Sequence, residues 1–173
     1  NVQMNSAPPG LFDSDWFGPL GGLLARVPML SSLGNHDIRV ARGQWYLDAL
    51  SLPTNGPPGL AERNYSYDYG NAHFVVIDAN AFVPDGDTTY TNPAAQRALI
   101  TTWLTNDLHT TTQLWKFVSY HHPPYTSQGT HNDAEVMKAT LSPIFEKYGI
   151  NIAFQGHNHF FERINPINGV NYI

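Results

Sequence analysis

Five of the eight histidines in this 173-residue chain come just after a segment that is predicted to be a β-strand. His36 follows "MLSSLGN", His121 and His122 follow "KFVSY", and His157 and His159 flank Asn158 after "IAFQG". In an open α/β sheet, ligand sites collect beyond the carboxyl ends of the strands. A lone histidine is more often a hydrogen-bonded structural residue, but similar placement on three loops predicts that the imidazoles converge.

Composition restricts the chemistry that such a site can use. There is no cysteine, which excludes thiol nucleophiles, disulfides and cysteine zinc sites. A metal would have to bind His, Asp, Glu or Asn, a donor set that suits zinc, iron or manganese. The net charge is −5 with no basic run, so nucleic acid is not an expected partner.

Hydrophobic content is 42% and charged content only 13%, against about 25% charged residues in an average globular protein. The chain is therefore globular, and its low charge is common in exported proteins, so we expect a secreted or periplasmic location. No apolar run approaches the length of a membrane span, so a membrane is not an expected partner. The oligomeric state is left open.

Alternating strand and helix patterns predict an α/β fold. The Tyr-rich stretch 64–69 and the apolar run that follows Gly70-Asn71 predict a β-hairpin. Asn92-Pro93 predicts the start of one helix, and Asn132 with Glu135 predicts the start of a second that ends at Gly149. The other predicted elements are a short helix within 14–25, a buried strand at 27–33, helical turns at 43–50, and strands at 114–120, 150–155 and near the last residues.

Three short blocks together resemble the calcineurin-like metallophosphoesterases. They are "LGNHD" (33–37), "YHHPPY" (120–125) and "QGHNHFFER" (155–163), in the order that the family has them. The stretch "NYSYDYGNAHFVVIDAN" (64–80) is similar to the purple acid phosphatase branch. The resemblance implies a four-layer α/β/β/α sandwich with mixed sheets, present here in part, with residues 1–173 as a single, truncated catalytic domain.

The resemblance also implies a role for each matching residue. Asn35, His121 and His157 match ligands of one metal ion, and His159 matches a ligand of a second. His36 matches the histidine that contacts phosphate and protonates the leaving oxygen, with Asp37 orienting it. His131 matches a substrate-contacting histidine, and His122, where the family has a small residue, is expected to line the substrate pocket or to be a bystander.

The implied activity is hydrolysis of phosphate monoesters by a dinuclear centre of Fe, Zn or Mn, with a metal-bound hydroxide as nucleophile. The substrate is then a phosphorylated small molecule. A phosphodiesterase or nucleotidase of the same family would carry the same blocks. A third possibility is an inactive remnant that binds at most one metal ion.

Two blocks that supply aspartates to the metals in this family do not occur before "GNHD". The acids upstream of that block are Asp13 and Asp15, neither at a Gly-Asp turn. We expect that the family's Gly-Asp lies directly before Asn1 in a longer protein. We also expect the isolated chain to be a poor catalyst, because few anionic ligands would offset two cations.

Overall fold

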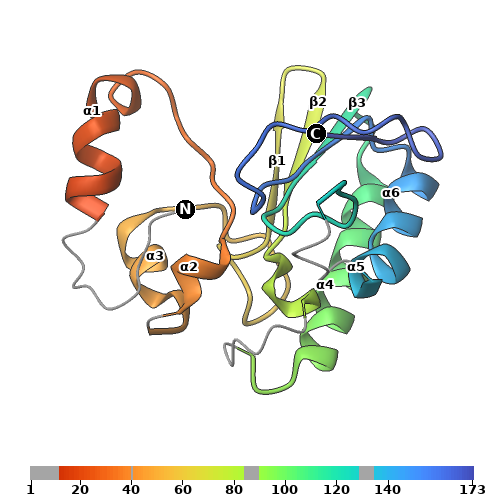
Figure 1. Cartoon of the computed structure of the whole chain (residues 1–173), viewed down its shortest axis with the longest axis horizontal. Coiled ribbons are helices and arrows are strands. Elements are labelled where there is room, and N and C mark those ends of the chain that lie inside the picture. The colour runs from red at the N-terminus through yellow and green to blue at the C-terminus, as the bar shows by residue number, and fades with distance from the viewer. Residues whose placement is uncertain (1–11, 40, 84–89, 129–134) are drawn as a thin grey trace.

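A five-stranded mixed sheet organises the chain in a computed structural model, which describes residues 12–39, 41–83, 90–128 and 135–173. The strand order is β1-β2-β3-β4-β5, of which Figure 1 labels the first three. β1 and β2 form an antiparallel hairpin, and β2 to β5 run parallel to one another. The bounds are β1 Tyr65–Tyr69, β2 Ala72–Val76, β3 Trp115–Ser119, β4 Ile152–Phe154 and β5 Asn171–Tyr172.

Helices cover one face of this sheet and form the larger core. α4 (Pro93–Thr110) connects β2 to β3, and α5 (Glu135–Thr140) with α6 (Ser142–Tyr148) lies between β3 and β4 (Figure 1). Such helical crossovers are what parallel strands require. The buried residues include Val75, Val118 and Ala153 from the strands and Ile100, Leu104, Leu108 and Phe145 from the helices.

A second core joins the hairpin to the N-terminal elements. The N-terminal elements are a π-helix at Asp13–Phe17, α1 (Gly18–Leu24), α2 (Asn35–Ile38), a 3-10 turn at Ala41–Gly43 and α3 (Gln44–Ala49); a further 3-10 turn, Ala79–Phe82, follows β2. Of these N-terminal elements, the π-helix, α2 and α3 contribute side chains to the second core. Leu33 and Ile38 flank the "GNHD" block and are both buried in this second core. The block is therefore held against the β1–β2 hairpin by its apolar neighbours.

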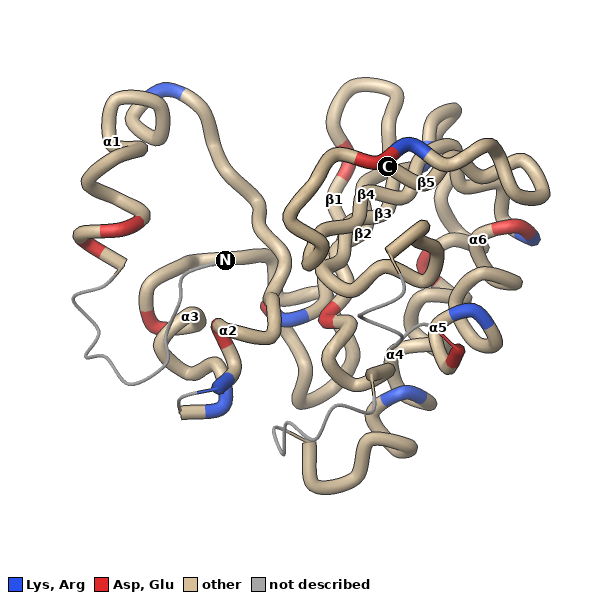
Figure 2. The backbone as a smooth tube through the Cα atoms, viewed as in Figure 1, with Lys and Arg blue, Asp and Glu red and all other residues tan. Residues whose placement is uncertain are grey.

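Aromatic side chains from four neighbouring strands form a row across the sheet. Ring centroids lie 5.0 Å apart for Tyr67 and Phe74, 5.0 Å for Phe74 and Phe117, and 6.3 Å for Phe117 and Phe154. Such contacts add to the hydrogen-bonded ladder in holding the register. Lysine, arginine, aspartate and glutamate are sparse along the backbone (Figure 2).

Most predicted elements are confirmed. The hairpin turns at Gly70-Asn71, strands occur at 115–119 and 152–154, and the short helices at 14–25 and 43–50 are present. Asn92 caps α4 by accepting a hydrogen bond from the Ala95 amide at 3.1 Å. Gly149 ends α6 in the left-handed conformation, with φ 67°.

The predicted strand at 27–33 is wrong. This segment has no ladder partner among the described residues. Instead, the Ser31 carbonyl accepts hydrogen bonds from the hydroxyls of Tyr46 and Tyr65, both at 2.7 Å. An apolar run indicates burial but does not say which groups satisfy its backbone.

The single helix predicted to end at Gly149 is two helices, because α5 ends at Thr140 and α6 begins at Ser142. Pro143 sits in the first turn of α6, where its missing N–H and fixed φ favour a helix start. The predicted start at Asn132 lies outside the described residues.

Candidate metal centre

Side chains from three separate loops meet at the carboxyl end of the parallel strands. Asn35 opens α2, His121 follows β3, and His157 follows β4. Asn35 Oδ1 lies 3.0 Å from His121 Nε2, and His157 Nδ1 lies 3.2 Å from the same nitrogen. Residues more than eighty positions apart in the sequence thus place their donor atoms around one point.

The turn that carries Asn35 is fixed by its own sequence. The Asp37 carboxylate accepts a hydrogen bond from the Gly34 amide at 2.8 Å, one half of a capping box. Leu33 and Ile38 are buried on either side of the turn. Asn35 itself is buried, so its amide faces the other ligand candidates rather than solvent.

Backbone hydrogen bonds hold the loops after β3 and β4 together beyond the strand ends. The Tyr120 amide donates to the Phe154 carbonyl at 3.1 Å, and the Gly156 amide donates to the His121 carbonyl at 2.9 Å. His157 has φ 71°, a left-handed conformation that is uncommon for a side chain other than glycine. Such strain persists where the surrounding structure demands it, and it clusters at functional sites.

Three side-chain contacts, which the sequence analysis did not find, reinforce this junction. The Asn158 amide donates to Thr126 Oγ1 at 2.7 Å, and the Gln155 amide donates to the Tyr125 carbonyl at 2.8 Å. Glu162 accepts from the Ser127 amide at 2.9 Å. The segments 125–127 and 155–162 are thereby tied together next to the two histidine loops.

His122 joins His121 and His157 in a compact group of imidazoles. The three residues offer nitrogen atoms that all lie within 4.8 Å of one another. Among the described residues this is the group of histidines and acids with the spacing of metal ligands, and it includes no carboxylate. The sequence analysis placed His122 at the substrate pocket. The signal that could have placed it in this imidazole group is that it directly follows His121 in the chain.

Burial keeps the imidazole of His121 uncharged. Loss of solvent, together with the neighbouring charges of His157, His36 and His159, lowers the pKa of His121 to about 3. A neutral imidazole keeps the lone pair that a metal ion needs. His121 is therefore a neutral donor at neutral pH.

His36 lies beside the cluster on α2 and is half-buried. Its Nδ1 is 3.4 Å from Nη1 of Arg39. Burial first, then the charges of Arg39 and His159, lower the pKa of His36. The Asp37 carboxylate accepts a hydrogen bond from the Gly34 amide. That Asp37 also orients His36 stays a prediction.

The remaining predicted residues occupy different positions. His159 is exposed, outside the three-imidazole group but near enough for its charge to affect both His36 and His121. His131 lies outside the described residues. Asp78, a buried acid after β2 that the sequence analysis did not single out, accepts hydrogen bonds from Asn80 and Tyr90 and pairs with Arg63 at 3.6 Å.

The donors that the structure brings together fit a metal ion. Two ligands of one tetrahedral zinc ion, each bound at about 2.0–2.1 Å, lie ~3.3 Å apart. The separations of His121 Nε2 from Asn35 Oδ1, 3.0 Å, and from His157 Nδ1, 3.2 Å, are close to that value. Imidazole and amide oxygen are also chemically suited to zinc, iron or manganese.

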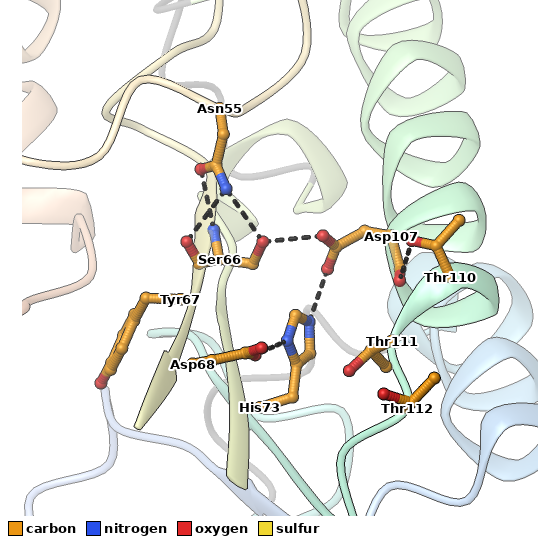
Figure 3. A pocket seen from close by; sticks show the side chains of 9 residues that line it. All are labelled: Asn55, Ser66, Tyr67, Asp68, His73, Asp107, Thr110, Thr111 and Thr112. Carbon is orange, nitrogen blue, oxygen red and sulfur yellow. Dashed lines mark hydrogen bonds and ion pairs between the residues drawn. The ribbon is translucent and has the colours of Figure 1, made fainter. Parts of the chain in front are cut away.

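His73, another buried histidine, lies near the amino end of β2 and so at the opposite end of the sheet from the histidine loops; Figure 3 shows it among the residues that line its pocket. His73 Nδ1 is 2.7 Å from Asp68 and its Nε2 is 2.8 Å from Asp107, in a polar cavity of about 440 Å³. Burial opposes the charged form, but hydrogen bonds and charge from Asp107 and Asp68 outweigh it and raise the pKa of His73. The ring joins the hairpin to α4.

Comparisons with known proteins place these features in a family. The chain is 29% identical over 160 residues to purple acid phosphatase 15 of Arabidopsis thaliana, covering 88% of this chain and 28% of that protein. It is 27% identical over 159 residues to acid phosphatase type 7 of Mus musculus, covering 83% and 34% respectively. The chain therefore spans about a third or less of the length of these relatives.

The fold is similar to that of purple acid phosphatase PPD1 from yellow lupin seeds, with a TM-score of 0.56 at 20% identity over 84% of this chain and 28% of that one. Within the described residues, no helix combines the length and apolar character needed to cross a membrane. The family model for calcineurin-like phosphoesterases matches residues 9–161. Since this match takes in most of the sequence, the chain belongs to the calcineurin-like phosphoesterase family.

Proposed function

We propose that the protein hydrolyses phosphate monoesters of small molecules at the centre formed by these loops. The convergence of Asn35, His121 and His157, from three segments, on one point carries this proposal. These three residues would hold one metal ion, and His159 would contribute to a second. Iron, zinc and manganese are the candidate metals.

Bound metal ions would activate the ester as Lewis acids, and they would lower the pKa of the attacking water towards neutrality. The chain's own groups do the rest. His36 stands beside the cluster with its ring partly exposed, so it can reach a substrate oxygen. Once protonated, it would give its proton to the leaving oxygen, which is general acid catalysis. Arg39, next to His36, adds positive charge that attracts a phosphate dianion.

The absence of a carboxylate from the three-imidazole group, among the described residues, favours a second candidate. Neutral donors offset none of the charge of two adjacent cations, so binding of a second ion at this site would be weak. On that basis the 173-residue chain alone hydrolyses esters slowly or only binds one metal ion. A protein with further acidic ligands would be the efficient phosphatase.

Parallel assays of the 173-residue chain and of a version extended upstream in its gene test the proposal. Each is loaded with zinc, manganese or iron and assayed with 4-nitrophenyl phosphate and with bis(4-nitrophenyl) phosphate. We expect metal-dependent hydrolysis that is faster for the monoester and much faster in the longer chain. Preference for the diester would select a phosphodiesterase, and no turnover in either chain would select the inactive remnant.

Two further properties belong to the same proposal. Residues 1–173 are proposed to form part of one catalytic domain, supported by the family match over 9–161 and by the single described sheet. A secreted or periplasmic location is proposed from the low proportion of charged residues, 13%. Fractionation of the native host, with the activity followed by the same assay, would test the location.

A further inference from the structure

His157 lies at the centre of a tight turn that directs its ring toward His121. Its φ is 71°, and the backbone N–H of Asn158 donates a hydrogen bond to the Gly156 carbonyl at 2.8 Å. A hydrogen bond that closes three residues around a central residue of positive φ is the mark of the less common γ-turn, which is strained. The position of His157 Nδ1 therefore depends on a backbone conformation that a side chain other than glycine rarely adopts.

The side chain of Asn158 ties this turn to the loop that follows β3. Its amide donates to Thr126 Oγ1 at 2.7 Å, and both residues are half-buried. Thr126 belongs to the same loop as His121. One side-chain hydrogen bond thus connects the turn of one proposed metal ligand to the loop of another, in addition to the backbone bond between Gly156 and His121 at 2.9 Å.

The two kinds of bond make different demands on the sequence. The backbone bonds need no particular side chain, whereas the bond to Thr126 requires a polar group at position 158. Left-handed backbone at a non-glycine residue persists only where the surrounding structure holds it. The bond between Asn158 and Thr126 is a contact that can do so from outside the turn itself.

We infer that Asn158 is a positioning residue for the metal centre. Its bond to Thr126 holds His157 in the left-handed turn, so that Nδ1 of His157 stays 3.2 Å from Nε2 of His121. This inference rests on the proposed function, because it requires that the site bind metal.

Zn²⁺ affinity and stability, measured on the same variants, test this role. Thr126→Val removes the hydroxyl at nearly constant shape, Thr126→Ser keeps it, and Asn158→Leu removes the other partner. Thr101→Val is the matched control, because it removes a half-buried threonine hydroxyl that bonds the Arg97 carbonyl at 2.9 Å within α4, a helix that carries none of the proposed ligands. Calorimetric titration gives the Zn²⁺ affinity of the folded chain, and urea denaturation without metal gives its stability.

We expect Zn²⁺ affinity to fall by about 10-fold or more in Thr126→Val and in Asn158→Leu. The two changes combined should cost no more than either alone, because they break one bond. Thr126→Ser and Thr101→Val should keep the affinity of the unmodified chain.

Reduced stability with unchanged Zn²⁺ affinity in Thr126→Val and Asn158→Leu would overturn the inference and leave the proposed metal site intact. Additive losses of affinity in the double variant would also overturn it. No Zn²⁺ binding by the unmodified chain would remove the metal site and this inference together. Either single variant decides the matter if the other does not fold.

Discussion

Two buried histidine clusters lie at opposite ends of the same sheet and differ in their neighbours. At the carboxyl ends of the strands, His121 is surrounded by imidazoles and an amide. At the amino end of β2, His73 lies between two carboxylates (Figure 3). The pKa of His121 falls to about 3, whereas that of His73 rises.

The difference shows that burial does not by itself decide what a histidine does. Burial disfavours the imidazolium in both clusters, and only Asp68 and Asp107 reverse its effect. The raised pKa of His73 favours its cationic form, and both of its nitrogens are used in hydrogen bonds, which stabilises the fold. His121 is kept neutral with its donor atom directed at other ligand candidates, which suits a metal site.

The largest expected effect is on catalysis at the carboxyl end. In the active, metal-loaded protein, His36→Asn should lower turnover by about 10²- to 10⁴-fold, the usual contribution of a general acid. The loss should be greater with phenyl phosphate than with 4-nitrophenyl phosphate, because the poorer leaving group needs the proton more. Equal losses with both substrates would contradict the role of His36, and His73→Asn should leave their ratio unchanged.

The second-largest expected difference between the two clusters is in Zn²⁺ affinity. His121→Asn removes the nitrogen on which Asn35 and His157 converge, so Zn²⁺ affinity should fall by about 100-fold or more. His73→Asn should change that affinity little, because its ring lies at the other end of the sheet. Calorimetric titration with Zn²⁺ measures both, and equal losses in the two variants would contradict the separation.

Stability should show the reverse pattern. His73→Asn leaves the part-buried carboxylate of Asp107 without its imidazolium partner, so the free energy of unfolding should fall by about 2 kcal/mol. His121→Asn removes no charge pair and should cost less in the absence of metal. Urea denaturation followed by circular dichroism provides the comparison.

The His73 contribution should depend on pH in a defined direction. Its folded pKa is raised above its unfolded value of about 6.5, so its stabilising effect is complete below that pH and is lost as pH rises through the folded pKa. The difference in unfolding free energy between the unmodified chain and His73→Asn should therefore shrink as the pH rises above about 6.5. A difference that grows with pH would mean that His73 is buried neutral.

The smallest effect should come from the edge of the same pocket. Ser66 Oγ donates to Asp107 at 2.7 Å, and Ser66→Ala should lower stability by about 1 kcal/mol. Gln113→Ala, which removes a bond to the exposed side of Asp68, should cost less. If Gln113→Ala cost more than His73→Asn in thermal melts, the imidazolium would not be the centre of this network.

Local patterns predicted the hairpin and the start of α4 because turn and cap residues act on their immediate neighbours. The absence of a strand at 27–33 could not be predicted, since the tyrosine hydroxyls that bond Ser31 come from distant segments. The two-helix arrangement could have been predicted from Pro143. The meeting of Asn35, His121 and His157 follows from the strand order, but the inclusion of His122 depends on loop geometry that spacing does not encode.

Anomalous diffraction at the zinc edge, from crystals of the chain grown with Zn²⁺, tests the metal centre most directly. We predict a peak at the position where Asn35 Oδ1, His121 Nε2 and His157 Nδ1 converge, at about 2.0–2.2 Å from each. A zinc-grown crystal in which these three atoms keep their direct hydrogen bonds, with no peak between them, would contradict the assignment of this cluster as a metal site.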